Sequence, residues 1–261
     1  IRSRSYFGNS ELAATGLASK DELSILEAYR GRVPDAVFTA EYQPPKTKGD
    51  GRIRANLKIG DALLKEAGWI IKDKKRVNVE TGAAMEFEIL LVSPMFERIA
   101  LPFTKNLERL GVKARVRTVD SSQYQRRLET FDFDMIVSAW GASLSPGNEQ
   151  RDFWSAAAAN QNGSRNVIGI SDPVIDELIE TLIAAPDRES LINRTKALDR
   201  VMQWGHYVIP HWHLDYDRLI FWSKLQRPEV TPLKGSQFDT WWVNPESAIK
   251  TQNVQKLHKA K

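Results

Sequence analysis

The residues best suited to metal binding are the histidines near position 210. His211 and His213 flank Trp212, and His206 lies shortly before them. Side chains at positions i and i+2 of a strand point to the same side, so this pair could share an ion. A metal site needs further ligands, and the sequence offers neither a third ligand at matching spacing nor an H-E-x-x-H motif. We therefore interpret the segment as structural, and we expect no metal and no cofactor.

Two other groups could perform hydrolysis. Asp132 and Asp134 are separated by one residue, and paired carboxylates do acid–base work in glycosidases. Ser143 and His206 could supply a nucleophile and a base, but no G-x-S-x-G elbow is present. Because no complete set of acid, base and nucleophile is recognisable, we expect that the chain is not an enzyme. A hydrolase using Asp134 or His211 remains the alternative.

A stronger indication of a binding site comes from residues 138–149 (SAWGASLSPGNE), which follow the end of an expected buried strand. Ligands of open α/β sheets bind at the carboxyl ends of the strands. Trp140 offers a flat apolar platform, and Gly141 allows a ligand to approach the backbone. A structural loop with one core tryptophan is the alternative. The residues that we predict to contact a ligand are Trp140, Gly141, Ser143, Asn148 and Glu149.

The elements that would position this stretch form a β-α-β-α-β pattern. Apolar alternation predicts strands at 85–93, 112–119 and 133–140, and helical periodicity predicts helices at 96–110 and 121–130. A strand, a helix and a strand in this order form a parallel pair with a right-handed crossover. The sequence therefore predicts an α/β domain.

The rest of the chain reads mainly as helices and loops. Residue 21, an aspartate, could cap a helix at 20–30, and a helix at 54–68 would bury Leu57, Leu63 and Leu64 on one face. Pro173 could begin another helix. The remaining expectations are a polar hairpin at 72–82, a long loop at 141–171, a helix containing residues 191–202, strands at 207–212 and 216–222, and a frayed end at 247–261.

Composition places the chain among ordinary globular proteins. It has 261 residues, 42% of them hydrophobic and 27% charged, with a net charge of +4 and no cysteine. The lack of cysteine excludes disulfides and thiolate metal sites. The basic balance could indicate nucleic-acid binding, but acidic residues are interspersed throughout, so we expect no nucleic-acid partner. No apolar run is long enough to span a membrane, so we expect the chain not to be membrane-spanning.

Several stretches, in order along the chain, resemble one family of proteins. They are residues 5–17 (SYFGNSELAATGL), 62–69 (ALLKEAGW), 131–136 (FDFDMI), 143–150 (SLSPGNEQ) and 205–212 (GHYVIPHW). The resemblance is to the large solute-binding proteins of ABC importers for oligopeptides, dipeptides and nickel. It is greatest to the YejA-type branch, which binds peptides and microcin C.

The resemblance implies the α/β fold of the type II, two-lobed periplasmic binding proteins, with a mixed sheet containing the βαβ unit. This chain would hold mainly the second lobe, at 1–208, while 209–261 would form the hinge crossing and strands returning to the first lobe. The beginning of the chain, without a methionine or a signal peptide, suggests a fragment that lacks most of the first lobe. Self-association of the truncated chain through apolar surface at Trp222, Trp241 and Trp242 is then expected.

The function that the resemblance implies is capture of oligopeptides or peptide-like compounds in the periplasm, and their delivery to an ABC permease in the inner membrane. Sugar- or opine-type binding on the same fold is the alternative. One departure concerns Ser143, which stands where peptide-binding relatives have an aspartate for the ligand's amino terminus. Glu149 or Asp152 could substitute for it.

Overall fold

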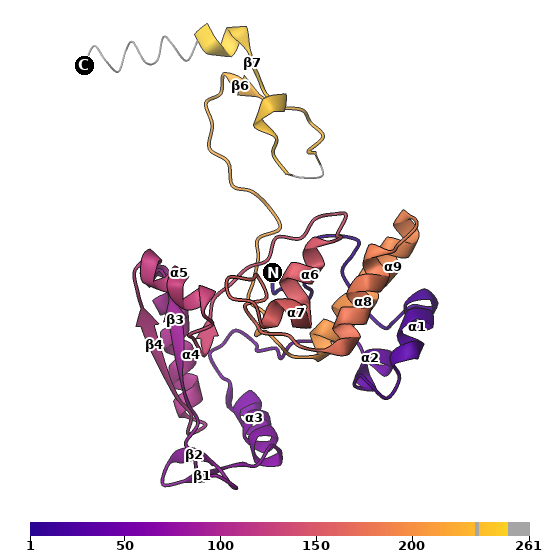
Figure 1. Cartoon of the computed structure of the whole chain (residues 1–261). Helices are drawn as coiled ribbons and strands as arrows, with labels where there is room; N and C mark the ends of the chain where they lie inside the picture. Colours follow the sequence, from indigo (N-terminus) through magenta and orange to yellow (C-terminus); the bar gives the residue numbers. More distant parts are fainter. Residues whose placement is uncertain (233–234, 250–261) are drawn as a thin grey trace, which may run out of the picture. The chain divides into compact units, whose positions relative to one another are not determined.

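The computed structural model describes residues 1–232 and 235–249, and the chain forms two compact units (Figure 1). The larger unit comprises Arg4–Pro210. The smaller unit combines Ile1–Ser3 with the chain from His211 onward. The chain therefore passes between the units twice, once near each end of the larger one.

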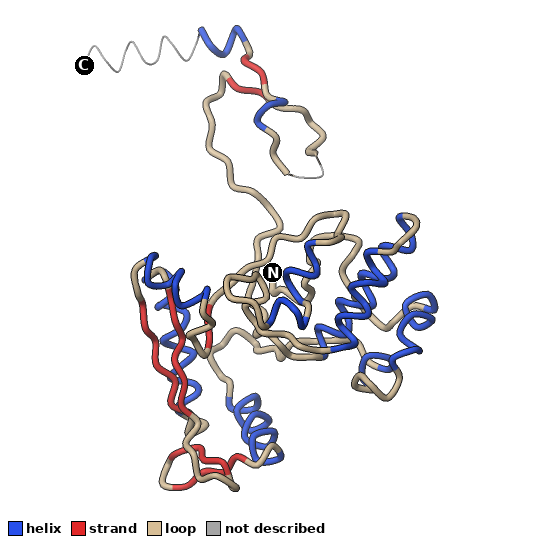
Figure 2. Tube along the Cα trace, in the orientation of Figure 1, coloured by secondary structure: helices blue, strands red, loops and turns tan. Residues whose placement is uncertain are grey.

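A three-stranded parallel sheet lies in the larger unit, with strand order β4-β3-β5 (Figure 2). Its strands are β3 (Glu86–Leu91), β4 (Lys113–Thr118) and β5 (Met135–Ile136), linked by α4 (Glu97–Glu108), which follows the short 3₁₀ turn η2 (Pro94–Phe96), and by α5 (Ser121–Glu129). The predicted β-α-β-α-β pattern and its parallel pairing are confirmed.

The two faces of β3 and β4 differ because side chains alternate along a strand. Ile89 and Leu91 point to α4 and pack with Ala100 in a buried cluster. On the other face, Glu86 and Glu88 of β3 lie beside basic residues of β4 and form cross-strand ion pairs such as Lys113–Glu86 at 2.9 Å, while Leu90 is buried there. Burial of one face of the sheet against α4 thus fixes the register of the strands.

Strand β5 is shorter than the predicted strand at 133–140. Asp134 Oδ2 accepts a hydrogen bond from the Glu88 backbone N–H at 2.8 Å, so the side chain takes a donor that a longer ladder would use. After the strand, the Tyr124 hydroxyl donates to the Val137 carbonyl at 3.4 Å. Side chains therefore replace backbone pairing on both sides of β5, and residues 138–140 leave the sheet.

An antiparallel hairpin, β1 (Trp69–Lys72) and β2 (Lys75–Asn78), lies beside helix α3 (Arg54–Glu66). A hairpin was predicted at 72–82, and the observed one begins and ends a few residues earlier. Buried Arg76 holds this region together, since its guanidinium donates to Asp61 Oδ1 at 2.7 Å and to two backbone carbonyls. The expected burial of Leu63 is wrong: it is 60% exposed, because α3 meets its neighbours at one edge and buries no residue fully.

Helices dominate the rest of the larger unit. They are α1 (Lys20–Leu26), η1 (Glu27–Tyr29), α2 (Ala36–Thr39), α6 (Glu149–Trp154), α7 (Ala156–Ala159), α8 (Pro173–Ile183) and α9 (Arg188–Trp204). Apolar faces of α8 and α9 form the main core with α1, α2 and α6. Pro173 begins α8 as expected, and the Asp172 side chain caps that helix through the Val174 N–H at 2.8 Å.

Two expectations about the helices are wrong. Ser19, not Asp21, caps α1, by accepting from the Glu22 N–H at 3.2 Å, while Asp21 lies in the first turn. The loop expected at 141–171 contains α6 and α7. These helices span 6 and 4 residues, too few for a periodic pattern, and tertiary packing of the buried residues Phe153 and Trp154 stabilises the first.

The smaller unit has little regular structure within its described residues. The strands expected at 207–212 and 216–222 are not formed. Residues 1–3 pair with residues 211–213 through backbone hydrogen bonds, but this pairing amounts to one isolated bridge, Arg2 to Trp212. A short ladder joins β6 (Leu225–Gln226) to β7 (Trp242–Val243), near the 3₁₀ turn η3 (Phe238–Thr240).

The tryptophans of this unit differ in exposure. Trp222 and Trp242 are 56% and 48% exposed, whereas Trp241 is half-buried and packs edge-to-face on Phe221 at 4.7 Å. Self-association through them remains a prediction. Most of the end expected to fray, 247–261, lies outside the described residues. No described helix is both long and apolar enough to cross a membrane.

Candidate ligand-binding site

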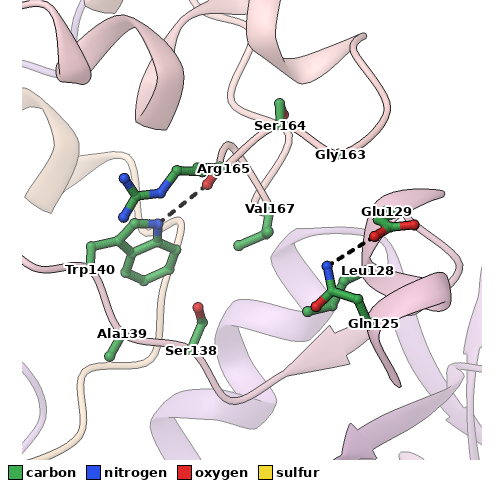
Figure 3. A pocket seen from close by; sticks show the side chains of 10 residues that line it. All are labelled: Gln125, Leu128, Glu129, Ser138, Ala139, Trp140, Gly163, Ser164, Arg165 and Val167. Carbon is green, nitrogen blue, oxygen red and sulfur yellow. Dashed lines mark hydrogen bonds between the residues drawn. The ribbon is translucent and has the colours of Figure 1, made fainter. Parts of the chain in front are cut away.

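A pocket of about 200 Å³ opens beside the end of β5 (Figure 3). Three segments of the larger unit line it: α5 through Gln125, Leu128 and Glu129, the stretch 138–140 after β5, and a loop at 163–167. The pocket thus lies where the chain leaves a parallel strand at its carboxyl end, the expected place for a ligand in this class of fold.

Trp140 forms one wall of the pocket. Its indole packs against Trp154 with ring centroids 5.2 Å apart, and thereby against the main helical core. Its Nε1–H points to the carbonyl of Arg165 at 3.5 Å, a long contact (Figure 3). The ring is half-buried, with Trp154 on one side, and it presents an apolar surface to the cavity.

Asn166 fixes the loop that forms the third wall. Its side chain is fully buried and turned away from the pocket, where Nδ2 donates to the carbonyls of Ser155 and Ile170, each at 2.9 Å. Oδ1 accepts from the N–H groups of Gly169 and Ile170 at 3.1 and 3.0 Å. All four hydrogen-bonding positions of the amide are used, so the lining residues on either side of it are held in place.

The C-terminus of α5 is joined to the same loop. The Glu129 carbonyl accepts a hydrogen bond from the Gly163 N–H at 2.9 Å. Carbonyls at the end of a helix have no partner within the helix, so this bond satisfies one of them. Nearby, burial raises the pKa of Tyr124, whose hydroxyl donates to the chain after β5. Backbone hydrogen bonds and tight packing therefore connect all three walls.

Arg165 lines the pocket, but its guanidinium is held by groups of the protein. Its guanidinium lies over the Phe153 ring, 4.1 Å from the centroid, and 4.0 Å from Asp152. In Figure 3 the side chain runs along the Trp140 indole, away from Val167 and Ser138. Stacking on an aromatic face and a nearby carboxylate both hold the cation in that position.

One of the predicted contact residues, Trp140, lines the pocket, and the other four do not. Gly141 is exposed, with open space where a Cβ would lie. Ser143 Oγ accepts from the Ser145 N–H at 2.9 Å, and Asn148 Oδ1 from Arg151 at 2.6 Å. Glu149 Oε1 accepts from Gly147 and from the Gln150 side chain. A ligand role for all five stays a prediction.

The sequence reasoning missed the lining residues on α5 and at 163–167. Gln125 and Glu129 are four residues apart, so the sequence indicated that they lie on one face of a helix. Nothing in the sequence placed that helix face beside the end of β5. The loop at 163–167 has no periodicity. Its one signal was Asn166, a polar residue directly before the apolar pair Val167 and Ile168, and such a residue is buried only where its hydrogen bonds are satisfied.

The residues considered for metal binding and catalysis have structural roles. His211 stacks on Trp212 at 5.1 Å, and burial and nearby Arg2 lower its pKa. Asp132 pairs with Arg127 at 3.0 Å, and Asp134 binds the β3 backbone. Within residues 1–232 and 235–249, no group of three or more metal-ligating side chains is present.

Comparison with known families gives a match over residues 25–162, more than half of the chain. The matching model describes bacterial extracellular solute-binding proteins, family 5, middle region. The chain belongs to this family. The resemblance inferred from the sequence is therefore confirmed.

Two relatives from Agrobacterium fabrum are similar along most of the chain. A probable peptide-binding protein, YejA, is 42% identical over 92% of this chain and 39% of its own length. YepA, described as a peptidoglycan-binding protein, is 38% identical over the same shares. The chain thus spans well under half the length of these relatives.

The fold is shared with a solved oligopeptide-binding protein. AppA, the oligopeptide-binding protein of Bacillus subtilis solved with a nonapeptide, superimposes with a TM-score of 0.58 at 18% identity, over 86% of this chain and 45% of AppA. The predicted α/β, periplasmic-binding-protein-like fold class is confirmed. The assignment of 1–208 to the second lobe and of 209–261 to the hinge and returning strands remains a prediction.

Proposed function

We propose that this family 5 chain is part of a periplasmic binding protein that captures oligopeptides or peptide-like compounds and delivers them to an ABC permease. The observation that carries the proposal is the pocket at the end of β5, walled by Trp140, in a chain whose fold is that of a protein solved with a nonapeptide. The relatives are named as binding proteins, so the proposed role is transport and not catalysis.

Binding by such a wall requires no chemistry on the ligand. The Trp140 indole packs on an apolar part of the ligand, while nearby polar groups bind its donors and acceptors. Closure of a second lobe over the ligand removes water from these contacts, and the closed form is the one that the permease recognises. Gly141, Ser143, Asn148 and Glu149 extend the wall in this proposal.

A second ligand class is favoured by one relative. YepA is described as peptidoglycan-binding, which suggests peptides derived from the cell wall, with or without sugars attached. Such compounds are peptide-like, so they fall within the proposed function and differ from it only in the ligand's origin. Free sugars and opines are the further alternatives.

Thermal-shift screening tests the proposed ligand class. The protein is the product of the complete gene, because the chain spans about 39% of its relatives' length. Peptide pools, muropeptides, free sugars, opines and nickel are tested separately. Ligand binding raises the unfolding midpoint by mass action, to the greatest extent for the true ligand class. Stabilisation by sugars, opines or nickel alone, or by nothing, would contradict the proposal.

The role of Trp140 is tested by two substitutions. Trp140→Ala removes the apolar wall, and we expect the affinity for a peptide hit to fall about tenfold or more, consistent with the cost of truncating a buried aromatic contact. Trp140→Phe retains a flat ring and should keep most of the affinity. Isothermal titration of both variants measures this. Equal affinity of Trp140→Ala and the unchanged protein would remove Trp140 from the site.

A further inference from the structure

Three donor groups among the lining residues already have partners within the protein. The Ser164 hydroxyl donates to the Ala158 carbonyl at 2.7 Å, and the Trp140 Nε1–H is directed at the Arg165 carbonyl. The Arg165 guanidinium lies over Phe153. A ligand group entering the pocket therefore meets these three donors only where they give up a partner.

Acceptor groups are available instead. Gln125 donates through Nε2 to Glu129 Oε1 at 3.1 Å, which leaves the Gln125 amide oxygen and one oxygen of the Glu129 carboxylate without that bond (Figure 3). Among the described residues, no basic side chain forms an ion pair with Glu129. Ser138 adds a hydroxyl that points into the same space.

The apolar residues of the lining and the size of the pocket suit one long side chain. The Trp140 ring, Leu128 and Val167 line the pocket between Glu129 and the end of β5. The volume of about 200 Å³ equals that of about seven water molecules, since each occupies about 30 Å³ in the liquid. The pocket can therefore hold one long side chain but not several residues. An aliphatic stem can pack on these surfaces while its tip remains polar.

We propose that this pocket is a subsite for one basic side chain of the bound ligand, with the methylene stem against Trp140 and the cation at Glu129. The proposal rests on the proposed function, that the ligand is a peptide or peptide-like compound. It adds a preference for a lysine-like or arginine-like side chain at one ligand position.

The test compares lysine with norleucine, which has a similar stem but no charge. The probes are alanine pentapeptides that carry lysine, or norleucine, at each position in turn, titrated into the product of the complete gene. The variant is Glu129→Gln, which keeps the shape and removes the charge. The control is Glu66→Gln at the exposed end of α3, away from the lining residues.

We expect lysine to be preferred over norleucine by up to about fivefold at one position, since a rim ion pair contributes up to about 1 kcal/mol. Glu129→Gln should abolish that preference by lowering the affinity for the lysine peptide, while Glu66→Gln should retain the preference.

Two results would overturn the subsite while leaving peptide binding intact. They are equal binding of lysine and norleucine peptides at every position, and a lysine preference that survives Glu129→Gln. If no pentapeptide and no peptide pool binds, the proposed function fails, and the subsite fails with it.

Discussion

At the scale of single residues, Asp199 on α9 is the most constrained ionisable group. It is fully buried, and it accepts hydrogen bonds from the backbone N–H groups of Tyr6 and Ala14 at 2.9 and 2.8 Å and from Gln203 at 3.0 Å. Burial raises the pKa of this carboxyl to about 6, because desolvation outweighs the hydrogen bonds and the neighbouring Arg200, which lower it.

This pKa predicts a pH dependence of stability. A raised pKa means that the folded state binds the proton more tightly than the unfolded chain. The Asp199 contribution to the unfolding free energy therefore falls as pH rises from about 4 to about 6, by on the order of 2 kcal/mol. Urea unfolding of the unchanged protein and of Asp199→Asn, across this range, measures the contribution as a difference. Parallel curves for the two proteins would contradict the prediction.

At the scale of elements, the turn between α4 and β4 has the tightest backbone contact among the positive-φ glycines. Gly111 has φ +78°, and a Cβ there would lie 2.9 Å from the Arg76 backbone nitrogen. The Arg76 N–H donates to the Gly111 carbonyl at 2.8 Å, and the Arg76 guanidinium binds the neighbouring Leu110 carbonyl. The hairpin β1–β2 is therefore attached to the βαβ unit at a point where no side chain fits.

Replacing Gly111 should lower the unfolding free energy by more than the strain of a left-handed backbone conformation alone. Gly111→Ala is expected to lower the unfolding free energy by about 2–3 kcal/mol, through backbone strain together with steric overlap. The matched control is Gly82→Ala, which has φ +69° and nothing within 4 Å, so only the strain of about 1 kcal/mol should appear. Equal losses for the two variants in denaturant titrations would show that the close contact relaxes freely.

At the scale of the whole molecule, the two units differ in their internal structure. The larger unit has two hydrophobic clusters, whereas no described residue between Trp212 and Leu225 lies in a helix or strand. Arg218 is exposed within that stretch, and proteases cut preferentially in exposed segments of this kind.

Limited trypsin digestion of the 261-residue chain should therefore cut first after Arg218. The expected product retains the larger unit intact, and mass spectrometry of early time points identifies the cut. The basic residues of α9, such as Arg194 and buried Arg200, provide the internal comparison. Early cleavage within α9 would contradict the division into units.

The sequence predicted the elements whose signals are local. The strands around Ile89 and Val116 were found because apolar residues alternate there, and α8 because Pro173 precedes an apolar stripe. The helix α6 was missed, since six residues hold too little periodicity and Trp154 is buried by contacts with distant segments. The predictions of strands at 207–212 and 216–222 were wrong. Alternation of apolar residues indicates a preference for extended backbone, but a strand also needs a neighbouring strand to pair with its backbone N–H and C=O groups.

For the candidate site, the sequence by itself placed Trp140 just after a parallel strand, because of the β-α-β-α-β order. Ligands of open α/β sheets bind at the carboxyl ends of the strands, so this position indicated a binding site. Only the tertiary structure decided which segments face that ring. Glu129 and Gln125 line the same pocket from a helix that precedes the strand, and Asn166 holds the loop at 163–167 through hydrogen bonds to the backbone. A pocket is made by segments distant along the chain, and their approach depends on packing that no local pattern records.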